Sequence, residues 1–198
     1  MGLDIVYLNG QTPLDEDEKE GLLLPVIATR AELDEFEQQN IEEAIQWVLT
    51  RPLKTEAILT EQFVRDLHKR MYKNVWAWAG AFRKTNKNLG VDKWQIAEAL
   101  KALLDDTLYW TEHDTFCPDE IAIRFKHRIV SIHCFPNGNG RHSRLMADVI
   151  VDKIYRLPVF SWGAGNPVIQ SKTRTNYLKA LRAADKNNYE PLLLFARS

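Results

Sequence analysis

Apolar residues recur at spacings of three and four along most of this chain, and that period constrains the fold to helices. The clearest run follows Thr29, where apolar positions from Leu33 to Val48 fall on one helical face. Comparable patterns predict further helices over residues 60–71, 93–112, 118–132, 139–154, 170–185 and 189–196. The sequence therefore predicts an almost all-α fold.

Helix-start signals stand at the boundaries of these runs. Thr29 and Glu32 have the spacing of a capping box, in which each side chain bonds the backbone amide of the other residue. Thr60 is placed to cap the next helix. Pro118 stands where a helix begins, and its missing N–H costs no hydrogen bond there.

Length, charge and cysteine content narrow the class of protein. A chain of 198 residues suffices for one well-packed domain; we assign residues 1–28 to an extended acidic lead-in and residues 29–198 to that domain. A net charge of -1 gives no electrostatic case for binding nucleic acid or an anionic membrane, and no run of about 18 apolar residues predicts a membrane span. Two cysteines, Cys117 and Cys134, and no signal-peptide pattern lead us to expect a cytoplasmic protein.

The segment HCFPNGNGRHSR begins at His133 and lies between two predicted helices. Gly138 and Gly140 let the backbone turn tightly and let a ligand approach it closely. The helix that follows presents unpaired amides and the positive end of its dipole, which favour an anion. The guanidinium groups of Arg141 and Arg144 match phosphate oxygens. With His133 as a proton acceptor beside them, the pattern indicates phosphoryl or nucleotidyl transfer to a hydroxyl.

The same segment also has an interpretation without chemistry, as a turn before a helix with His133 bonded in the core. The whole string, however, resembles the Fic family motif HPFx(D/E)GNGRxxR. Seven of its nine fixed positions match, namely His133, Phe135, Gly138, Asn139, Gly140, Arg141 and Arg144. Upstream, WAGAFR from Trp78 is similar to the family's W-A-G-x-x-R signature, and YLKALRAAD from Tyr177 resembles the branch called mobile mystery protein B. The resemblance covers the chain from about residue 29 to its end.

The resemblance implies a Fic-type helical domain that transfers AMP from ATP to a Ser, Thr or Tyr hydroxyl of a target protein, with Mg²⁺. His133 is then the base that takes the hydroxyl proton. Asn139 and the amides of Gly138 and Gly140 would hold phosphate oxygens and stabilise growing negative charge. Arg141 would neutralise the β- and γ-phosphates, and Arg144 would place the γ-phosphate.

Two positions depart from the motif, and a separate upstream segment corresponds to another element of the family. Asn137 replaces the carboxylate that binds Mg²⁺ in the family, so we expect it to ligate the metal more weakly, through a neutral oxygen. Cys134 replaces a proline. Residues Lys84, Thr85, Asn86 and Lys87 stand where the family has its flap, a short β-hairpin that positions the target by strand pairing. A solvated basic loop is the alternative for this segment.

Many Fic proteins are restrained by a helix with the motif (S/T)xxxE(G/N). The nearest string, TPLDED from Thr12, matches poorly. The glutamates of the helix after Thr29 are another candidate, for which a solvated acidic face is the favoured interpretation, and a separate antitoxin-like protein is a third source of restraint. Two further functions stay open, namely a non-catalytic module that binds a partner, and transfer of another phosphate-linked group.

Overall fold

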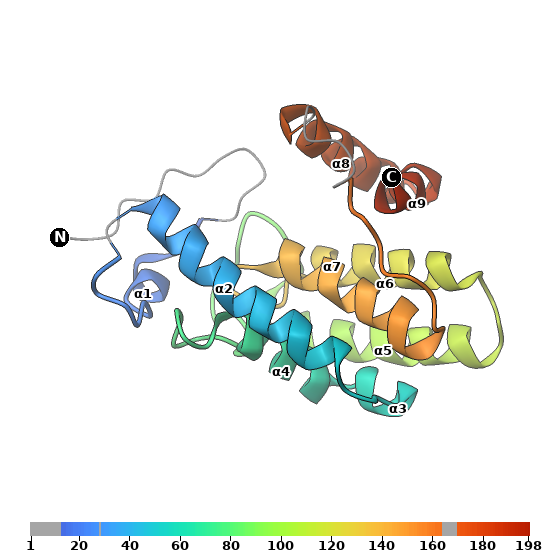
Figure 1. The fold of residues 1–198 in the computed structure, drawn as a ribbon, viewed down its shortest axis with the longest axis horizontal. Helices are drawn as coiled ribbons and strands as arrows, with labels where there is room; N and C mark the ends of the chain where they lie inside the picture. The colour runs from blue at the N-terminus through green and yellow to red at the C-terminus, as the bar shows by residue number, and fades with distance from the viewer. Residues whose placement is uncertain (1–12, 28, 164–169) are drawn as a thin grey trace.

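The structure, a computed structural model, describes residues 13–27, 29–163 and 170–198. Within these ranges all regular structure is helical (Figure 1), apart from one isolated bridge between Leu22 and Trp76, and no helix is long and apolar enough to cross a membrane. The elements are α1 (Glu16–Lys19), α2 (Arg30–Leu49), α3 (Thr55–Ile58), α4 (Glu61–Tyr72), η1 (Lys93–Gln95), α5 (Ile96–Glu112), α6 (Pro118–Ile132), α7 (Asn139–Val149), η2 (Ile150–Ile154), α8 (Gln170–Ala184) and α9 (Glu190–Arg197). The predicted all-α fold is confirmed.

The predicted helix starts are found at the residues that signalled them. The Thr29 hydroxyl accepts from the Glu32 amide at 3.3 Å, and the Glu32 carboxylate accepts from the Thr29 amide at 2.9 Å. Thr60 accepts from the amide of Phe63 at 3.1 Å. Pro118 is the first residue of α6. Local hydrogen bonding therefore sets these boundaries, which is why the sequence reveals them.

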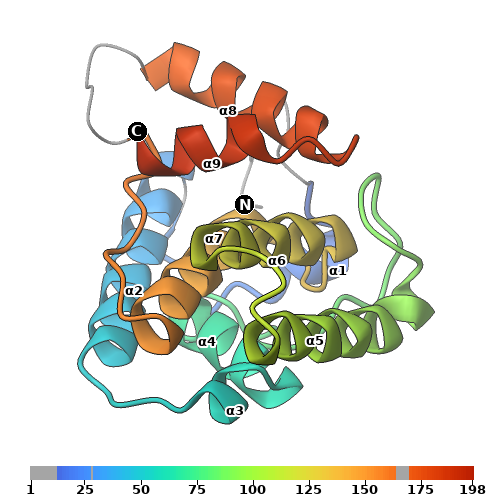
Figure 2. The ribbon, with the colours of Figure 1, turned by 90° about the vertical axis from the view of Figure 1, so that its right-hand side faces the viewer.

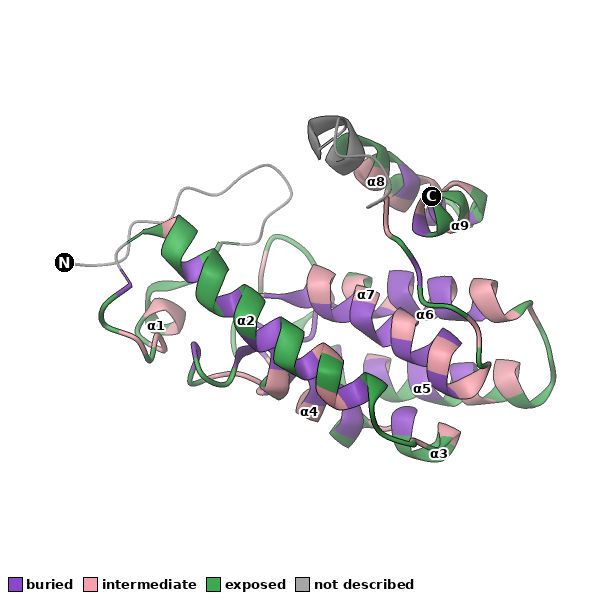
Figure 3. Cartoon of the chain, viewed as in Figure 1, coloured by how far each residue is buried: buried purple, intermediate pink, exposed green. Residues whose placement is uncertain are grey.

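Helix α6 lies at the centre of the molecule. It packs against α7, α5 and α9, while α2 packs against α4. Figure 2 shows the α8–α9 pair on one side of α6 and α7, with α4 and α5 on the other. Ala122, Ile123 and Phe125 of α6 are fully buried, and the inward faces of the surrounding helices are buried too (Figure 3). This arrangement fixes the junction between α6 and α7, where the motif begins.

The β-hairpin that the resemblance implies at Lys84 to Lys87 is not seen, because residues 84–90 are a loop and no strand forms in the described ranges. The backbone amides at the two ends of the loop bond to carbonyls at the end of α6, while the guanidinium of Arg83 also donates to the carbonyl of Val91. The amide of Arg83 donates to the carbonyl of Cys134 at 2.9 Å, and the amide of Val91 donates to the carbonyl of Ile132 at 3.3 Å. These bonds use amides that a hairpin would pair across its own strands.

The described part of the lead-in packs on the domain. Leu14 and Ile27 are buried in the common core, and the short helix α1 lies between them in the sequence. Thr12, the first residue of the string considered for inhibition, lies outside the described residues. The division of the chain at residue 28 stays a prediction.

Candidate active site

His133 ends α6 in the left-handed conformation, with φ 58° and ψ 60°. A side chain with a Cβ enters this region at a cost, so the surrounding structure must hold it there. The residue is 6% exposed, and its ring bonds the backbone carbonyl of Val130. Burial, with smaller contributions from the charges of Arg83 and Lys87, lowers the pKa of His133 to about 4. The imidazole is therefore neutral near pH 7 and has a lone pair with which to accept a proton.

The turn after His133 is closed by Asn139. Its amide oxygen accepts from the Phe135 amide at 3.0 Å, and its amide nitrogen donates to the Phe135 carbonyl at 2.8 Å. The buried side chain of Asn139 is thus committed to the backbone of the turn. Its predicted contact with phosphate oxygens stays a prediction.

A second histidine, His68, supports this turn, and no motif in the sequence assigns it to the site. The ring of His68 stacks on Phe135 with 3.7 Å between centroids, and its Nε2 lies 3.0 Å from the carbonyl oxygen of Asn137. Its Nδ1 accepts from the amide of Gly80 at 3.0 Å, so Nε2 carries the hydrogen and donates. The position of His68 four residues before Tyr72 in α4 is the available signal, because residues four apart share a helical face.

Gly138 is required by its conformation and by its neighbour. It adopts φ 77°, and a Cβ there would lie 2.5 Å from the ring of Tyr72. Gly140 differs, because a Cβ there would meet no atom within 4 Å. The amides of Asn139, Gly140 and Arg141 bond no acceptor among the described residues, since the first bonded amide of this turn is that of His142, to Gly138. The start of α7 therefore presents free donors beside open space, as an anion site requires.

Arg141 does not stand free beside these amides. One of its guanidinium nitrogens lies 2.6 Å from Oε2 of Glu37, and the guanidinium lies 5.2 Å from the centre of the Tyr72 ring. Glu37 is 3% exposed, and its Oε1 accepts from Nε1 of Trp76 at 2.7 Å. Burial alone would lower the pKa of Arg141, but its ionised neighbour Glu37 helps to raise it above the usual value, so the guanidinium is charged.

Glu37 corrects one interpretation from the sequence, which favoured a solvated acidic face for α2. Glu32, Glu35, Glu42 and Glu43 are exposed, as expected, but Glu37 is buried. The signal was available: Glu37 lies four residues after Leu33 and four before Ile41, in the middle of the apolar stripe.

Arg144 lies one turn along α7 and faces another element. Its guanidinium lies 5.7 Å from the centre of the Tyr177 ring in α8. It forms no ion pair with any residue in the described ranges. The two arginines that the sequence places on one face therefore contact α2 and α8 respectively, and only Arg144 keeps a guanidinium without a carboxylate partner.

The residues present do not fit a protein-held magnesium ion. Oδ1 of Asn137 accepts from the amide of Gly138 at 2.6 Å, and this neutral oxygen is the one ligand that the resemblance assigned. The described residues contain no group of three or more histidine, cysteine, aspartate or glutamate side chains that could hold a metal. Mg²⁺ prefers carboxylates and phosphates in octahedral geometry.

The loop proposed to position a target begins beside the base. Nε of Arg83 donates to the carbonyl of His133 at 2.7 Å, and its Nη1 donates to the carbonyl of Thr85 at 2.8 Å. Lys84, Thr85 and Asn86 are exposed, whereas Lys87 turns toward α1. The structure thus brings this loop and His133 together through Arg83.

Comparison with known proteins shows what this arrangement is similar to. Residues 58–151 match the model of the Fic/DOC family. A Fido domain-containing protein of Dictyostelium discoideum is 38% identical over 69 residues, which are 35% of this chain and 43% of that protein. A protein named protein adenylyltransferase Fic, from Nematostella vectensis, is 23% identical over 167 residues, which are 82% of this chain and 37% of that protein. The chain thus spans less than half the length of these two relatives.

Solved structures share the fold. The BepC protein of Bartonella tribocorum, an effector with bound AMPPNP, superposes with a TM-score of 0.69 at 14% identity, over 92% of this chain and 97% of that one. At this identity the similarity shows a shared fold, and any chemistry must be argued from the residues of the site. The match of residues 58–151 to the family model identifies that part of the chain as a Fic/DOC family domain, and BepC shares the helical fold.

Proposed function

We propose that this protein is a protein adenylyltransferase of the mobile mystery protein B branch, which moves AMP from ATP to a Ser, Thr or Tyr hydroxyl of another protein. One observation carries the proposal: a neutral, buried His133 ends α6, one short turn before a helix whose first three amides have no acceptor among the described residues. The adenylyltransferase named among the relatives and the nucleotide analogue bound to BepC support the choice of ATP.

In the proposed reaction, His133 takes the proton of the acceptor hydroxyl as its oxygen attacks the α-phosphorus of ATP. The new bond joins the acceptor oxygen to that phosphorus, and the bond to the β-phosphate oxygen breaks, so that pyrophosphate leaves. The amides of Asn139, Gly140 and Arg141 stabilise the negative charge on the phosphoryl oxygens. Because the donors are already fixed by the helix, they need no rearrangement as the charge develops.

The ion pair between Glu37 and Arg141 sets a condition on this reaction. An ATP phosphate that uses Arg141 must share or displace the carboxylate of Glu37, 2.6 Å away. Arg144 carries no such restriction. We therefore assign the first contact with the terminal phosphate to Arg144, and the contact of Arg141 to a later stage in which Glu37 has yielded.

The same ion pair favours a second candidate, a partner-binding module without catalysis in the free chain. Asn137 supports it as well, because the residue supplies no negative charge for a metal. In this alternative a separate antitoxin-like protein is the partner, and the cytoplasm is the compartment. Calorimetry with ATP distinguishes the two, because the adenylyltransferase binds the nucleotide alone and the module does not.

The proposal is tested with ATP that carries label on either the α- or the γ-phosphate, incubated with the protein and a cell extract. We expect α-label on protein and none from the γ-position, with loss of label in His133→Ala. His113→Ala is the matched control, because His113 is exposed and bonds only the Tyr109 carbonyl of its own helix. Label from the γ-phosphate would show a kinase instead. Equal labelling by His133→Ala and by the wild type would show that His133 is not the base.

A further inference from the structure

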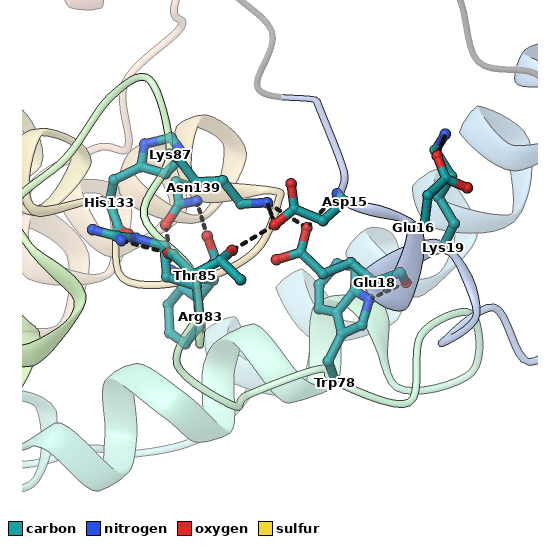
Figure 4. Close-up of polar contacts among 11 residues, drawn as sticks. Asp15, Glu16, Glu18, Lys19, Trp78, Arg83, Thr85, Lys87, His133 and Asn139 are labelled. Atoms are coloured by element: carbon teal, nitrogen blue, oxygen red, sulfur yellow. Dashed lines mark hydrogen bonds and ion pairs between the residues drawn. The ribbon is translucent and has the colours of Figure 1, made fainter.

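Lys87 is an unusual residue for an exposed loop, because its side chain is only 4% exposed. Its ammonium lies 2.8 Å from Oδ2 of Asp15 and 2.5 Å from Oε2 of Glu18. Figure 4 shows Lys87 extended from the loop toward these two carboxylates at the start of α1. One cation is thus held between two anions from a segment far away in the sequence.

A second side chain of the loop joins the same carboxylate. Oγ1 of Thr85 donates to Oδ2 of Asp15 at 2.6 Å. The bonds from Lys87 and Thr85 lower the pKa of Asp15, so its carboxylate is charged at neutral pH. Asp15 therefore binds two loop residues at once.

The segment that carries these carboxylates is itself fixed to the domain. The amide of Ala77 donates to the carbonyl of Gly21 at 2.8 Å, and Nε1 of Trp78 donates to the carbonyl of Glu18 at 2.9 Å. These contacts lie just before the loop in the sequence. The lead-in therefore has a firm attachment from which Asp15 and Glu18 reach the loop.

The other side of the loop lies against the base. Arg83 donates to the carbonyl of His133, and a Cβ on Gly90 would come within 2.7 Å of the Cβ of His133. The charge of Lys87 contributes to the lowered pKa of His133. A change in the position of Lys87 thus changes the surroundings of the imidazole.

We propose that residues 13–19 form a clasp that holds the loop of residues 84–90 in place over His133, with Asp15 and Glu18 as positioning residues for the acceptor protein. The inference rests on the proposed function, because it assigns the loop to the acceptor. The side chains of Lys87 and Thr85 contact the clasp, whereas Lys84 and Asn86 are exposed at the outer edge of the loop. The outer edge is therefore available to an acceptor while the loop stays fixed.

Hydrogen exchange tests the clasp without any need for catalysis. The double variant Asp15→Asn/Glu18→Gln keeps hydrogen-bond acceptors and removes both charges. We expect amides of residues 84–90 to exchange roughly fivefold faster, the scale of one partly exposed ion pair, while those of α5 do not change. Glu16→Gln is the matched control, because Glu16 is exposed on the same short helix and pairs with Lys19.

Lys87→Met provides the second arm. If the three side chains act as one unit, this variant loosens the loop by a similar factor alone, and by little more when added to Asp15→Asn/Glu18→Gln. Additive effects of the two changes, or an unchanged loop in either variant, would overturn the clasp. Because this arm measures only exchange, it stands or fails independently of AMP transfer.

The role of Asp15 and Glu18 in positioning the acceptor is tested by label transfer from α-labelled ATP to the proteins of a cell extract. We expect Asp15→Asn/Glu18→Gln to lower the label on acceptor proteins about fivefold, in proportion to the loop exchange, while the affinity for ATP measured by calorimetry does not change. Increased labelling would show that the segment blocks the acceptor instead and would overturn the proposal. If wild-type protein transfers no label but the loop responds as above, the proposed function fails and the structural clasp remains.

Discussion

Oε2 of Glu37 lies 2.6 Å from the guanidinium of Arg141, so a buried carboxylate of α2 already contacts an arginine in the first turn of α7, beside the free amides. The same carboxylate holds Trp76 through its other oxygen. The pair couples the packing of α2 to the charge available at the site. Its removal should affect stability and nucleotide binding in opposite directions.

Glu37→Gln is predicted to lower the free energy of unfolding by about 2 kcal/mol, the scale of a hydrogen bond to a charged group. The glutamine keeps an acceptor for Trp76 and loses the charge that neutralises Arg141. ATP should then stabilise the variant more than it stabilises the wild type, because its phosphates meet an unpaired guanidinium. Thermal unfolding with and without ATP measures both effects, with Glu35→Gln, exposed on the same helix, as control. A smaller ATP shift in Glu37→Gln than in wild type would contradict the prediction.

The two glycines of the motif should behave differently on substitution. Gly138→Ala is predicted to lower the free energy of unfolding by roughly 3 kcal/mol, because its Cβ would stand 2.5 Å from Tyr72 and its φ of 77° disfavours a side chain. Gly140→Ala should leave stability equal or raise it by up to about 1 kcal/mol, since alanine favours a helix and the new methyl meets nothing. Urea unfolding of both variants provides the comparison.

Gly140→Ala also tests where the nucleotide binds, because the position faces open space. If phosphates approach the amides there, the added methyl group should weaken ATP binding at least about tenfold while the protein remains stable, which calorimetry can measure. Unchanged ATP affinity in Gly140→Ala would show that the nucleotide binds elsewhere.

Acid pH should destabilise the protein through its buried histidines. Burial lowers the pKa of His133 and of His142 to about 4, against 6.5 when unfolded, and it also holds the pKa of His68 well below its usual value. Below pH 6.5 the unfolded chain binds protons that the folded chain does not, so stability is present above that pH and is lost as the pH falls toward 4. For His133 and His142 each shift is worth roughly 3 kcal/mol. Urea unfolding between pH 4 and 8 tests the direction, and the slope should decrease in His142→Gln.

The proposed base gives a separate dependence of activity on pH. A histidine with a pKa of about 4 is neutral throughout the range from pH 6 to 8. The initial rate of label transfer should therefore be nearly constant there and fall only as the pH approaches 4. A fall centred near pH 6.5 would show that the imidazole is not held in the buried position described here.

Lys126 is a buried amine whose Nζ has no hydrogen-bond partner among the described residues. It faces the ring of Tyr177 at 4.5 Å, and burial holds its pKa well below the usual range. Lys126→Met should raise the free energy of unfolding by about 1–3 kcal/mol, because it removes an unsatisfied polar atom and keeps the length of the side chain. Lys101→Met, on the exposed face of α5, is the control. A loss of stability in Lys126→Met would indicate that the amine has a bonded role in the core.

The sequence predicts those parts of the fold that local chemistry determines. Thr29, Thr60 and Pro118 mark helix starts because each acts on backbone groups within its own first turn. The site residues His133 and Arg144 are likewise readable, because the turn and the helix that present them are contiguous in the chain.

The features that the sequence does not predict depend on contacts between distant segments. The position of Glu37 in the apolar stripe of α2 indicates its burial but not its partners, Arg141 and Trp76, which come from two other parts of the chain. The composition of residues 84–90 allows a loop or a hairpin, and the contacts that the loop makes with the end of α6 and with α1 do not appear in the local sequence. These partners are determined by tertiary contacts, which a local sequence pattern does not contain.

The most direct test of the account is mass spectrometry of proteins from a cell extract after incubation with ATP and this protein. We predict that wild-type protein adds one AMP group to a Ser, Thr or Tyr residue, and that His133→Ala binds ATP with similar affinity and adds none. AMP transfer by His133→Ala at the wild-type rate would contradict the central claim that this imidazole, held at the end of α6, takes the proton of the acceptor.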